Sequence, residues 1–420
     1  MILELYLEKN NTNIRQLHIV SGIPETTIRG IGKREFLKWN VTFFDAIAKT
    51  VGKNRTKVMQ ELEELENQVI HFNSLGIYNI ENRRYIGNKN KLLHWISELI
   101  NNHTEGKIFF DVFAGTGVVT KKMLDSFDTF ILNDFLFSNN IIFEAFFGEE
   151  KYSKTKLIRI KDDFNKIKTN EEDDNYFSDN FGGKFFSVYD AKIIGEIRTK
   201  IEYNKLINKR EKAILIASLI YSSDKIANTV GHYDAYRKNV QLINRFKFEL
   251  INPLITSGKS IQIFREDANV LVKRIKSDVT FIDPPYNSRQ YSRFYHVLES
   301  IAVWDKPELE GVAMKRPIEN MSKYSLVTAP KIFDDLIQNL DTKYIVVTYN
   351  NTYNSRSSSS KNKITHDEIL ESLNKVGNTK IFEMPFQFFN AGKSNLKDHK
   401  EFVFITKVGQ LWEKRLNVQL

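Results

Sequence analysis

The feature that most constrains the fold is an apolar run at Ile108–Phe113 that leads into a glycine-rich turn, Ala114–Gly117. The helix-prone segment VVTKKML follows directly. A strand, a glycine turn and a helix in this order let a ligand approach bare backbone at the helix N-terminus. Glycine pairs at strand ends also occur in plain turns, so this pattern alone predicts an α/β fold and leaves the ligand open.

A second buried run, Thr129–Leu132, ends in Asn133-Asp134, and Asp134 lies 23 residues after Asp111. In doubly wound folds, an acid at the end of the second strand accepts hydrogen bonds from ribose hydroxyls. A carboxylate suits this task because it offers several acceptor positions and no donor. An exposed loop aspartate would look the same, but with the glycine turn it predicts a site for a nucleoside cofactor.

A third apolar run, Val279–Ile282, ends in Asp283-Pro284-Pro285-Tyr286. The two prolines fix φ, remove two backbone donors and leave carbonyls pointing outward. A rigid site with a carboxylate, a carbonyl and an aromatic ring fits a planar amine. The N–H groups of such an amine would donate to Asp283 and to the carbonyl of Pro284, and Tyr286 would stack on its ring.

Five motifs together resemble the D12 (Dam-like) class of N6-adenine DNA methyltransferases, in the order typical of the alpha group of amino-methyltransferases. In chain order they are RRYIGNKNKLL (Arg83–Leu93), DVFAGTG (Asp111–Gly117), LND (Leu132–Asp134), REDA (Arg265–Ala268) and DPPYNSRQYSRFYHVLESIA (Asp283–Ala302). The extended DPPYNSRQY form is similar to a subgroup that includes FokI-type modification methylases. The resemblance covers roughly Asn79 to Lys407.

The resemblance implies an α/β fold built on a Rossmann-like sheet that uses S-adenosylmethionine. The residues it implies for holding this cofactor are Tyr85, Lys89, Asp111, Gly115, Gly117, Asp134, Asp267 and Asp283. Those it implies for catalysis are Asp283, Pro284, Pro285 and Tyr286. Among the first set, Asp111 and the two glycines would line the methionine end, Asp134 would take the ribose hydroxyls, and Asp267 would lie near the cofactor adenine.

The resemblance also bears on metals and on the C-terminal part. No metal is expected, because the positive charge of the methyl donor vanishes as it reacts. The segment Lys400–Lys407 alternates like an edge strand and resembles the family's closing antiparallel hairpin. The aromatic-rich segment Ile381–Asn390 is expected either to help hold a flipped base or to pack in a core.

The order of the motifs predicts five parts along the chain. They are a helix-turn-helix-like domain at 1–66, a linker at 67–78, a cofactor half at 79–139, an inserted, mostly helical target-recognition domain at 140–261 and a catalytic half at 262–420. The insertion holds a basic stretch, Lys151–Lys168, and a mixed segment, Val230–Asn239. Both suit phosphate and base contacts, although each charge could equally be a solvated surface group.

The first segment has its own pattern. Apolar residues at Ile14, Leu17 and Val20 have helical spacing, Gly22 suits a tight turn, and Pro24 can open the next helix. The stretch IRQLHIVSGIPETTIRGI therefore resembles the Xre/Cro-like repressor family, with a small packing or dimerisation bundle as the alternative. The charged run Lys57–Gln68 predicts a solvated connector helix.

Composition excludes several classes of protein. The chain has 61 basic and 52 acidic residues in 420, a net charge of +9, which favours a polyanionic partner. Cysteine is absent, which excludes disulfides, thiolate zinc sites and a cysteine nucleophile. The start lacks the pattern of a signal peptide, and the longest apolar run, Ala213–Tyr221, is too short for a membrane span and predicts a buried helix. We expect a cytoplasmic bacterial or phage protein, with a mobile loop at Ser357–Ser360.

These patterns predict methyl transfer from S-adenosylmethionine to N6 of adenine in duplex DNA, within a restriction-modification system that could include a cognate endonuclease. The alternatives are an RNA N6-adenine methyltransferase, an N4-cytosine enzyme, and a DNA-binding regulator with a relic domain. In the family, Asp283 favours adenine over cytosine. A relic would have lost polar residues such as Tyr85 and Lys89. His296 and Glu299 are expected to pack or shape the pocket.

Overall fold

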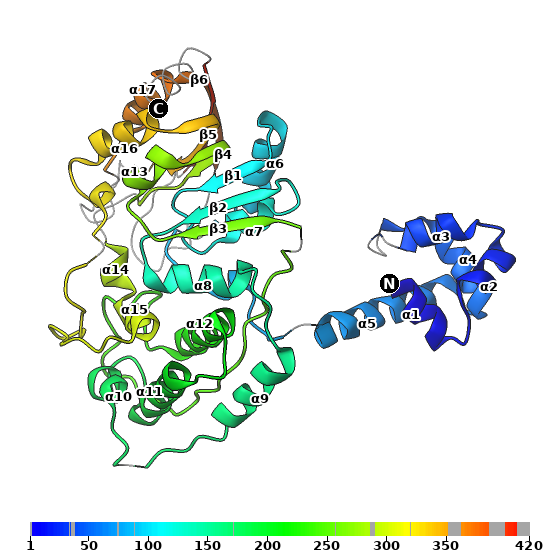
Figure 1. Cartoon of the computed structure of the whole chain (residues 1–420), viewed down its shortest axis with the longest axis horizontal. Coiled ribbons are helices and arrows are strands. Elements are labelled where there is room, and N and C mark those ends of the chain that lie inside the picture. The colour runs from blue at the N-terminus through cyan, green and yellow to red at the C-terminus, as the bar shows by residue number, and fades with distance from the viewer. Residues whose placement is uncertain are drawn as a thin grey trace. The chain divides into compact units, whose positions relative to one another are not determined.

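The computed structural model describes residues 2–32, 34, 38–73, 75–87, 89–170, 172–256, 258–285, 290–319, 321–351, 363–385 and 400–409. The chain divides into two compact units, Met1–Leu75 and Gly76–Leu420, coloured in chain order in Figure 1. The division falls inside the expected 67–78 linker, although helix α5 continues to Asn73. The predicted loop at Ser357–Ser360 lies outside the described residues.

The first unit is all helical. Its helices are α1 (Ile2–Lys9), α2 (Ile14–Ser21), α3 (Glu25–Gly32), α4 (Val41–Val51) and α5 (Arg55–Asn73). Asn13 caps the start of α2, and Gly22 ends it in the left-handed region with φ of 72°. Helix α3 follows after Pro24, so the two helices flank the expected glycine turn, while DNA binding by this unit stays a prediction.

The core of the first unit explains why these helices stay together. Phe43, Phe44 and Ile47 on α4 are buried against Ile14 and Leu17 on α2. These apolar residues form the buried face of α4, which ends at Gly52, also left-handed, with φ of 68°.

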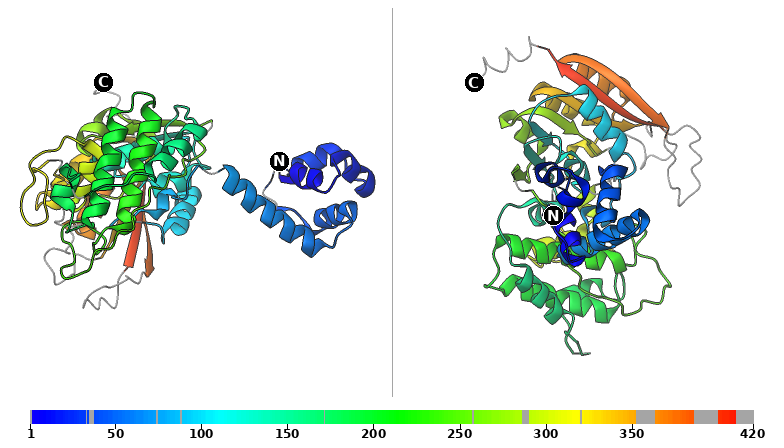
Figure 2. Two further views of the ribbon diagram at one scale, coloured as in Figure 1. Left: turned by 90° about the horizontal axis from the view of Figure 1, so that it is seen from below. Right: turned by 90° about the vertical axis from the view of Figure 1, so that its right-hand side faces the viewer.

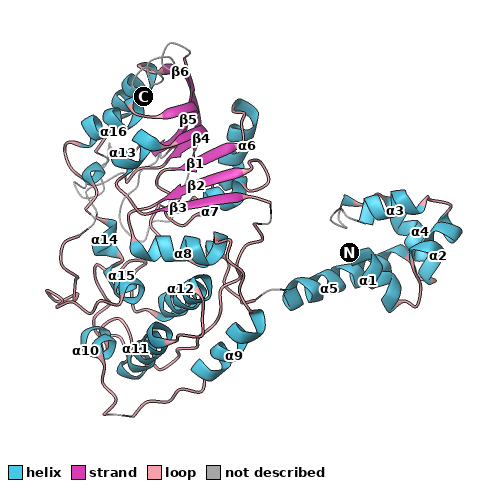
Figure 3. Ribbon diagram, in the orientation of Figure 1, coloured by secondary structure: helices cyan, strands magenta, loops and turns pink. Residues whose placement is uncertain are grey.

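A seven-stranded sheet forms the centre of the second unit, in the order β3-β2-β1-β4-β5-β7-β6 (Figures 1 and 3). The strands are β1 (Ile108–Asp111), β2 (Thr129–Asn133), β3 (Ser260–Phe264), β4 (Lys276–Ile282), β5 (Asp341–Asn350), β6 (Gly377–Pro385) and β7 (Lys400–Val408). Strands β1 to β5 pair in parallel, and β7 runs antiparallel between β5 and β6. The predicted α/β fold and its first two buried strands are confirmed.

One strand prediction was wrong in its placement. The antiparallel hairpin of β6 and β7 is present, orange to red in Figure 2, but β7 is an inner strand and β6 is the edge. Val403–Thr406 of β7 is buried at every residue because both faces of the strand are covered. Of the aromatic-rich segment Ile381–Asn390, residues 381–385 close β6, and 386–390 lie outside the described residues.

Helices cover both faces of the sheet (Figures 1 and 3). Those of the cofactor and catalytic halves are α6 (Leu93–His103), α7 (Val118–Met123), α13 (Ala268–Leu271), α14 (Tyr291–Phe294), α15 (His296–Val303), α16 (Ala329–Gln338) and α17 (His366–Asn374), with short 3-10 turns η2 (Ile80–Asn82), η3 (Val272–Arg274) and η4 (Lys323–Ser325). Helices α13, α16 and α17 pack on the face that carries Phe110 and Ile131. Helices α6 and α7 lie on the opposite side.

The expected insertion is helical and belongs to the same compact unit. Between β2 and β3 the chain forms α8 (Phe137–Phe147), α9 (Lys154–Phe164), α10 (Tyr176–Phe181), α11 (Val188–Tyr203) and α12 (Lys209–Ile226), the green helices of Figure 2. The run Ala213–Tyr221 is buried throughout α12, as predicted. Within the described residues, no helix is long and apolar enough to cross a membrane.

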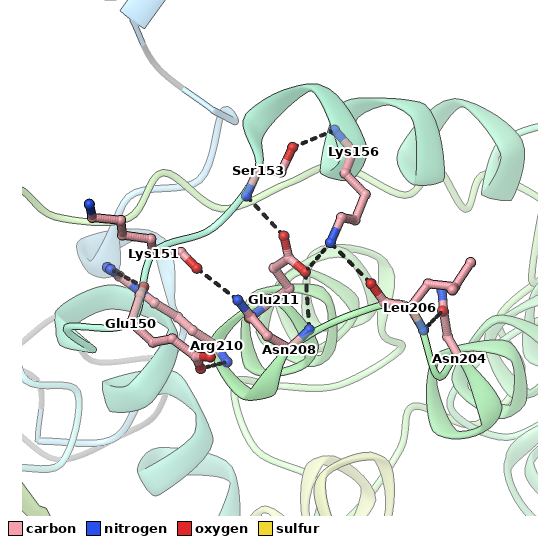
Figure 4. A network of polar contacts seen from close by, with 9 residues as sticks. All are labelled: Glu150, Lys151, Ser153, Lys156, Asn204, Leu206, Asn208, Arg210 and Glu211. Carbon is pink, nitrogen blue, oxygen red and sulfur yellow. Dashed lines mark hydrogen bonds and ion pairs between the residues drawn. The ribbon is translucent and has the colours of Figure 1, made fainter.

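A polar network fixes α9 against the start of α12 (Figure 4). The buried carboxylate of Glu211 accepts hydrogen bonds from the backbone N–H groups of Ser153 and Asn208, at 2.9 and 3.1 Å. The ammonium group of Lys156 lies 2.8 Å from the same carboxylate and donates to the carbonyl of Leu206 at 3.0 Å. Lys156, part of the basic stretch expected to contact phosphates, is thus engaged within the protein.

Candidate active site

One cavity opens at the carboxyl ends of the parallel strands, where the glycine turn and the Asp-Pro-Pro motif meet. Strand β1 pairs with β4, with Asp111 opposite Phe281, so the polar residues that follow these strands are neighbours. The expected site residues that line it are Tyr85, Lys89, Asp111, Gly115, Asp134, Asp267, Asp283, Pro284 and Pro285. Gly117 is not among its lining residues, and Tyr286 lies outside the described part of the chain.

The carboxylate of Asp283 is held from two sides. Its Oδ2 lies 2.8 Å from Nζ of Lys89, and its Oδ1 accepts a hydrogen bond of 2.9 Å from the hydroxyl of Thr348. Burial raises the pKa of Asp283, and Lys89 and Thr348 oppose that rise. Burial alone would lower the pKa of Lys89, but the carboxylates of Asp283 and Glu401 raise it above the ordinary lysine value.

The glycine turn lies beside the end of β2. Gly115 has φ of 55°, and its N–H donates to Oδ2 of Asp134 at 3.0 Å. Gly117, with φ of 76°, directly precedes α7, and a Cβ there would lie 3.1–3.2 Å from Ile80, Phe143 and Phe147. Gly115 therefore brings backbone to the cavity, whereas Gly117 allows close packing behind the turn.

Asp111 presents an unsatisfied oxygen at the cavity. The residue is 1% exposed, and its Oδ2 accepts a hydrogen bond of 2.8 Å from the hydroxyl of Thr120. Its buried Oδ1 has no hydrogen-bond partner among the described residues. Burial raises the pKa of Asp111 to about 7. A buried acceptor without a partner is costly, so Asp111 is suited to receive a donor from a ligand.

The other two expected acids organise backbone at the cavity rim. Besides Gly115, Asp134 accepts from the N–H of Leu136 at 2.9 Å, and burial raises its pKa to about 6. Asp267 caps α13 by accepting from the N–H groups of Asn269 and Val270, at 3.0 and 3.3 Å. Each oxygen of Asp134 can accept a second hydrogen bond, and both bonds of Asp267 go to its Oδ1, so both acids keep capacity for ligand hydroxyl or amino groups.

A cluster of three tyrosines forms a tyrosine wall, of which Tyr85 and Tyr291 line the cavity and Tyr295 packs behind them. The ring of Tyr85 stacks on those of Tyr295 and Tyr291, with centroid distances of 4.8 and 5.3 Å, and the centroids of Tyr291 and Tyr295 are 6.2 Å apart. The guanidinium of Arg83 lies 5.0 Å from the centroid of the Tyr85 ring. The hydroxyl of Tyr291 donates to the carbonyl of Ile86 at 3.3 Å. The hydroxyl of Tyr295 accepts a hydrogen bond from the N–H of Ile86 at 2.8 Å. Sequence reasoning missed both partners, although tyrosines four apart after the Asp-Pro-Pro motif were a visible signal.

His296 and Glu299 have structural tasks, as expected. Glu299 accepts hydrogen bonds from the N–H groups of Phe137 and Ser138 at the start of α8, at 3.0 and 2.8 Å. The ring of His296 lies between the carbonyls of Arg293 and Ala313, and burial lowers its pKa to about 4. No cluster of three or more His, Asp or Glu side chains suited to a metal ion occurs within the described residues.

Comparison with known proteins agrees with this geometry. Residues 85–358 match the family model of the D12 class N6 adenine-specific DNA methyltransferases. Modification methylase StsI of Streptococcus sanguinis is 32% identical over 76% of this chain and 50% of its own length, and type II methyltransferase M.FokI of Planomicrobium okeanokoites is 29% identical over 76% and 52%. Type II methyltransferase M.NlaIII of Neisseria lactamica is 28% identical over 75% and 95%.

The chain thus spans about half the length of the StsI and FokI enzymes and nearly the full length of the NlaIII enzyme. The matched residues include the tyrosine wall, the glycine turn, the helical insertion and the Asp-Pro-Pro motif, whereas the first unit lies before them. The match covers more than half of the sequence and includes strands β1, β2 and β4, whose carboxyl ends border the cavity. The chain therefore belongs to the D12 class of N6 adenine-specific DNA methyltransferases.

Proposed function

We propose that this protein transfers a methyl group from S-adenosylmethionine to N6 of adenine in duplex DNA, as the modification component of a restriction-modification system. The observation that carries the proposal is the cavity lined jointly by Gly115, Asp283 and Pro284, in which Asp283 is paired with Lys89. One chamber for a nucleoside donor and for an amine acceptor is what direct methyl transfer requires.

The residues around the glycine turn fit S-adenosylmethionine. The Oδ1 of Asp111, which has no partner in the described part of the chain, suits an ammonium group. Asp134 has acceptor capacity for ribose hydroxyls, and Asp267 suits an adenine amino group. Gly115 allows close approach of the ligand to the backbone. When bound, this cofactor supplies a methyl group on a positively charged sulfur.

The Asp283 end of the cavity fits the target base. An adenine in a duplex cannot reach this chamber, so it must first leave the stack. The carboxylate of Asp283 and the carbonyl of Pro284 would then accept hydrogen bonds from the two N6 protons and orient the nitrogen lone pair. Lys89 and Thr348 keep Asp283 in place for this task. Much of the rate would come from holding the reacting atoms at attack distance.

The test is analysis of nucleosides from DNA methylated by the purified protein with labelled cofactor. We expect N6-methyladenine from the wild type and none from Asp283→Asn, with DNA affinity largely retained. Asp128→Asn, an aspartate with a side chain 63% exposed, is the matched control and should be fully active. Three results would overturn the proposal. They are label in N4-methylcytosine, label that enters folded RNA but not duplex DNA, and an Asp283→Asn variant that methylates DNA as well as the wild type.

The restriction-modification role has its own support and test. The relatives are named modification methylases or type II methyltransferases, which suits this role. Long-read sequencing of DNA from cells that express this protein should show adenine methylation at one short motif. A cognate endonuclease would then cut unmethylated DNA at that motif and spare methylated DNA. Methylation scattered without a motif would contradict the role.

A further inference from the structure

A buried carboxylate joins the insertion to the tyrosine wall of the cavity. Asp224, near the end of α12, is 5% exposed and was not marked by any sequence motif. Its Oδ2 accepts a hydrogen bond of 3.3 Å from the N–H of Arg84 and lies 3.7 Å from Nε of the same residue. Arg84 directly precedes Tyr85, so Asp224 fixes the backbone from which the cavity wall begins.

The second oxygen of Asp224 reaches the segment Val230–Asn239. Its Oδ1 accepts a hydrogen bond of 2.9 Å from the hydroxyl of Tyr233, a residue only 1% exposed. A buried polar group is tolerated where such partners compensate its lost hydration, so both contacts stabilise the same carboxyl group. Moving either partner therefore changes the environment of the other.

The same segment also contacts the helix that follows the catalytic motif. The N–H of Tyr233 donates to the carbonyl of Phe294 at 2.8 Å, and the ring of His232 stacks on that of Phe294 at 4.6 Å. Phe294 closes α14, which begins with Tyr291 of the tyrosine wall. Two independent connections thus lead from this segment to the stacked rings of Tyr85 and Tyr291.

The outer part of the segment is exposed and carries two cationic side chains. Val230 is 60% exposed, and Arg237 and Lys238 are exposed as well. Cationic side chains beside a surface loop suit phosphate contacts in duplex DNA. One side of the segment therefore faces solvent. The other side is connected to the tyrosine wall through the hydrogen bond of Tyr233 to Asp224.

We infer that Asp224 is a positioning residue that couples DNA binding at Val230–Asn239 to cofactor binding at the tyrosine wall. The inference rests on the proposed function. It adds that duplex DNA and S-adenosylmethionine each increase the affinity of the protein for the other. Such coupling is reciprocal, because it is one free energy shared by two sites. Asp224 touches neither ligand and acts through Arg84 and Tyr233.

The experiment measures S-adenosylmethionine affinity of the full-length protein by calorimetry, with and without duplex DNA that contains its methylation motif. Asp224→Asn should weaken cofactor binding without DNA by about tenfold and abolish the tightening by DNA. Tyr233→Phe, which loses one hydroxyl, should keep cofactor affinity without DNA within about twofold and lose most of the tightening.

The matched control is Asp190→Asn. Asp190 is another buried acid of the insertion, 2% exposed, and accepts hydrogen bonds from the N–H groups of Arg245 and Phe246, so it fixes a different part of the chain. It should lower the melting temperature as Asp224→Asn does, yet leave cofactor affinity and its response to DNA unchanged.

Three outcomes would overturn the inference. The first is a wild type whose affinity for S-adenosylmethionine is the same with and without DNA. The second is a folded Asp224→Asn variant with the wild-type affinity and the wild-type increase on adding DNA. The third is a Tyr233→Phe variant with the wild-type increase. Tyr233→Phe decides the matter if Asp224→Asn fails to fold. A wild type that binds no S-adenosylmethionine at all would instead contradict the proposed function, so the two failures are distinguishable.

Discussion

Nζ of Lys89 lies 2.8 Å from Oδ2 of Asp283, and Lys89 is only 6% exposed. The family resemblance had implied a cofactor contact for Lys89, and the structure pairs Lys89 with the first residue of the Asp-Pro-Pro motif. A buried carboxylate without a counter-charge takes up a proton instead of staying ionised. Lys89 thus favours the ionised form of Asp283, which can only accept hydrogen bonds.

The first prediction concerns this ion pair. Lys89→Met should lower kcat by about 100-fold or more, because the acceptor for the target amine is lost when Asp283 binds a proton. The acidic limb of the pH–rate profile should also move to higher pH, since Lys89 then no longer opposes the rise that burial causes in the pKa of Asp283. Lys91→Met, at an exposed neighbouring lysine, is the control and should keep the wild-type profile. A profile that does not move in Lys89→Met would contradict this role.

The second prediction concerns Asp111 and pH. Burial raises its pKa from an ordinary 3.8 to about 7, so between about pH 4 and 7 the folded protein holds a proton that the unfolded chain has released. This group therefore makes the free energy of unfolding fall as the pH rises through that window. Asp111→Asn removes the contribution, and its melting temperature should fall less than that of the wild type between pH 5 and pH 8.

Cofactor binding gives Asp111 an opposite pH dependence. An ammonium group requires the ionised carboxylate, so S-adenosylmethionine affinity should rise from pH 6 to pH 8 in the wild type and stay nearly flat in Asp111→Asn. Thr120→Val keeps the carboxylate but removes a hydrogen bond that lowers the pKa of Asp111, so it should move the rise in affinity to higher pH. Equal pH dependence in wild type and Asp111→Asn would show that another group controls binding.

The sequence predicted the parts of the site that follow apolar runs. The glycine turn, Asp134 and Asp283 each come directly after a buried strand, and parallel strands bring their carboxyl ends to one edge. Thr348 could not be predicted in this way. It lies 65 residues after Asp283, and only the parallel pairing of β4 with β5 brings its hydroxyl to that carboxylate.

Two further features depended on tertiary packing. Asp224 sits in a helix where an acid usually faces water, and its burial follows from contacts with Arg84 and Tyr233 that are remote in sequence. The apolar–polar alternation at Lys400–Lys407 predicted an edge strand, but β6 pairs along its whole length and makes it an inner one. Alternation reports which face is apolar and does not report the number of neighbouring strands.

The third prediction separates structural from DNA-contacting cations in the basic stretch Lys151–Lys168. Lys151 and Arg159 are exposed and form no ion pair within the described part of the chain, whereas Lys156 is paired with the buried Glu211. Replacing the first two with alanine should reduce the salt slope of DNA binding by about 0.9 for each phosphate that these side chains neutralise in the wild type. Lys156→Ala should instead lower the free energy of unfolding by about 1 to 3 kcal/mol, because Glu211 loses a partner.

The control for the salt titration is Lys122→Ala with Lys273→Ala. Both lysines are exposed and lie outside the insertion, so this variant loses the same charge at another place. Its salt slope should match that of the wild type. Equal slopes for the two double variants would place the phosphate contacts elsewhere on the protein.

The last prediction concerns the first unit. Thr26 and Thr27 are exposed on α3, directly after the turn at Gly22, whereas Arg29 is paired with Glu4 at 2.9 Å. If this helix contacts base edges, Thr26→Ala with Thr27→Ala in the full chain should weaken binding to the DNA upstream of its own gene by about tenfold. Methylation of a plasmid should be unchanged, because the cavity lies wholly within residues 85–324. Gln60→Ala, exposed on α5 of the same unit, should affect neither measurement. Unchanged binding to the upstream DNA in the threonine variant would favour a packing role for these helices.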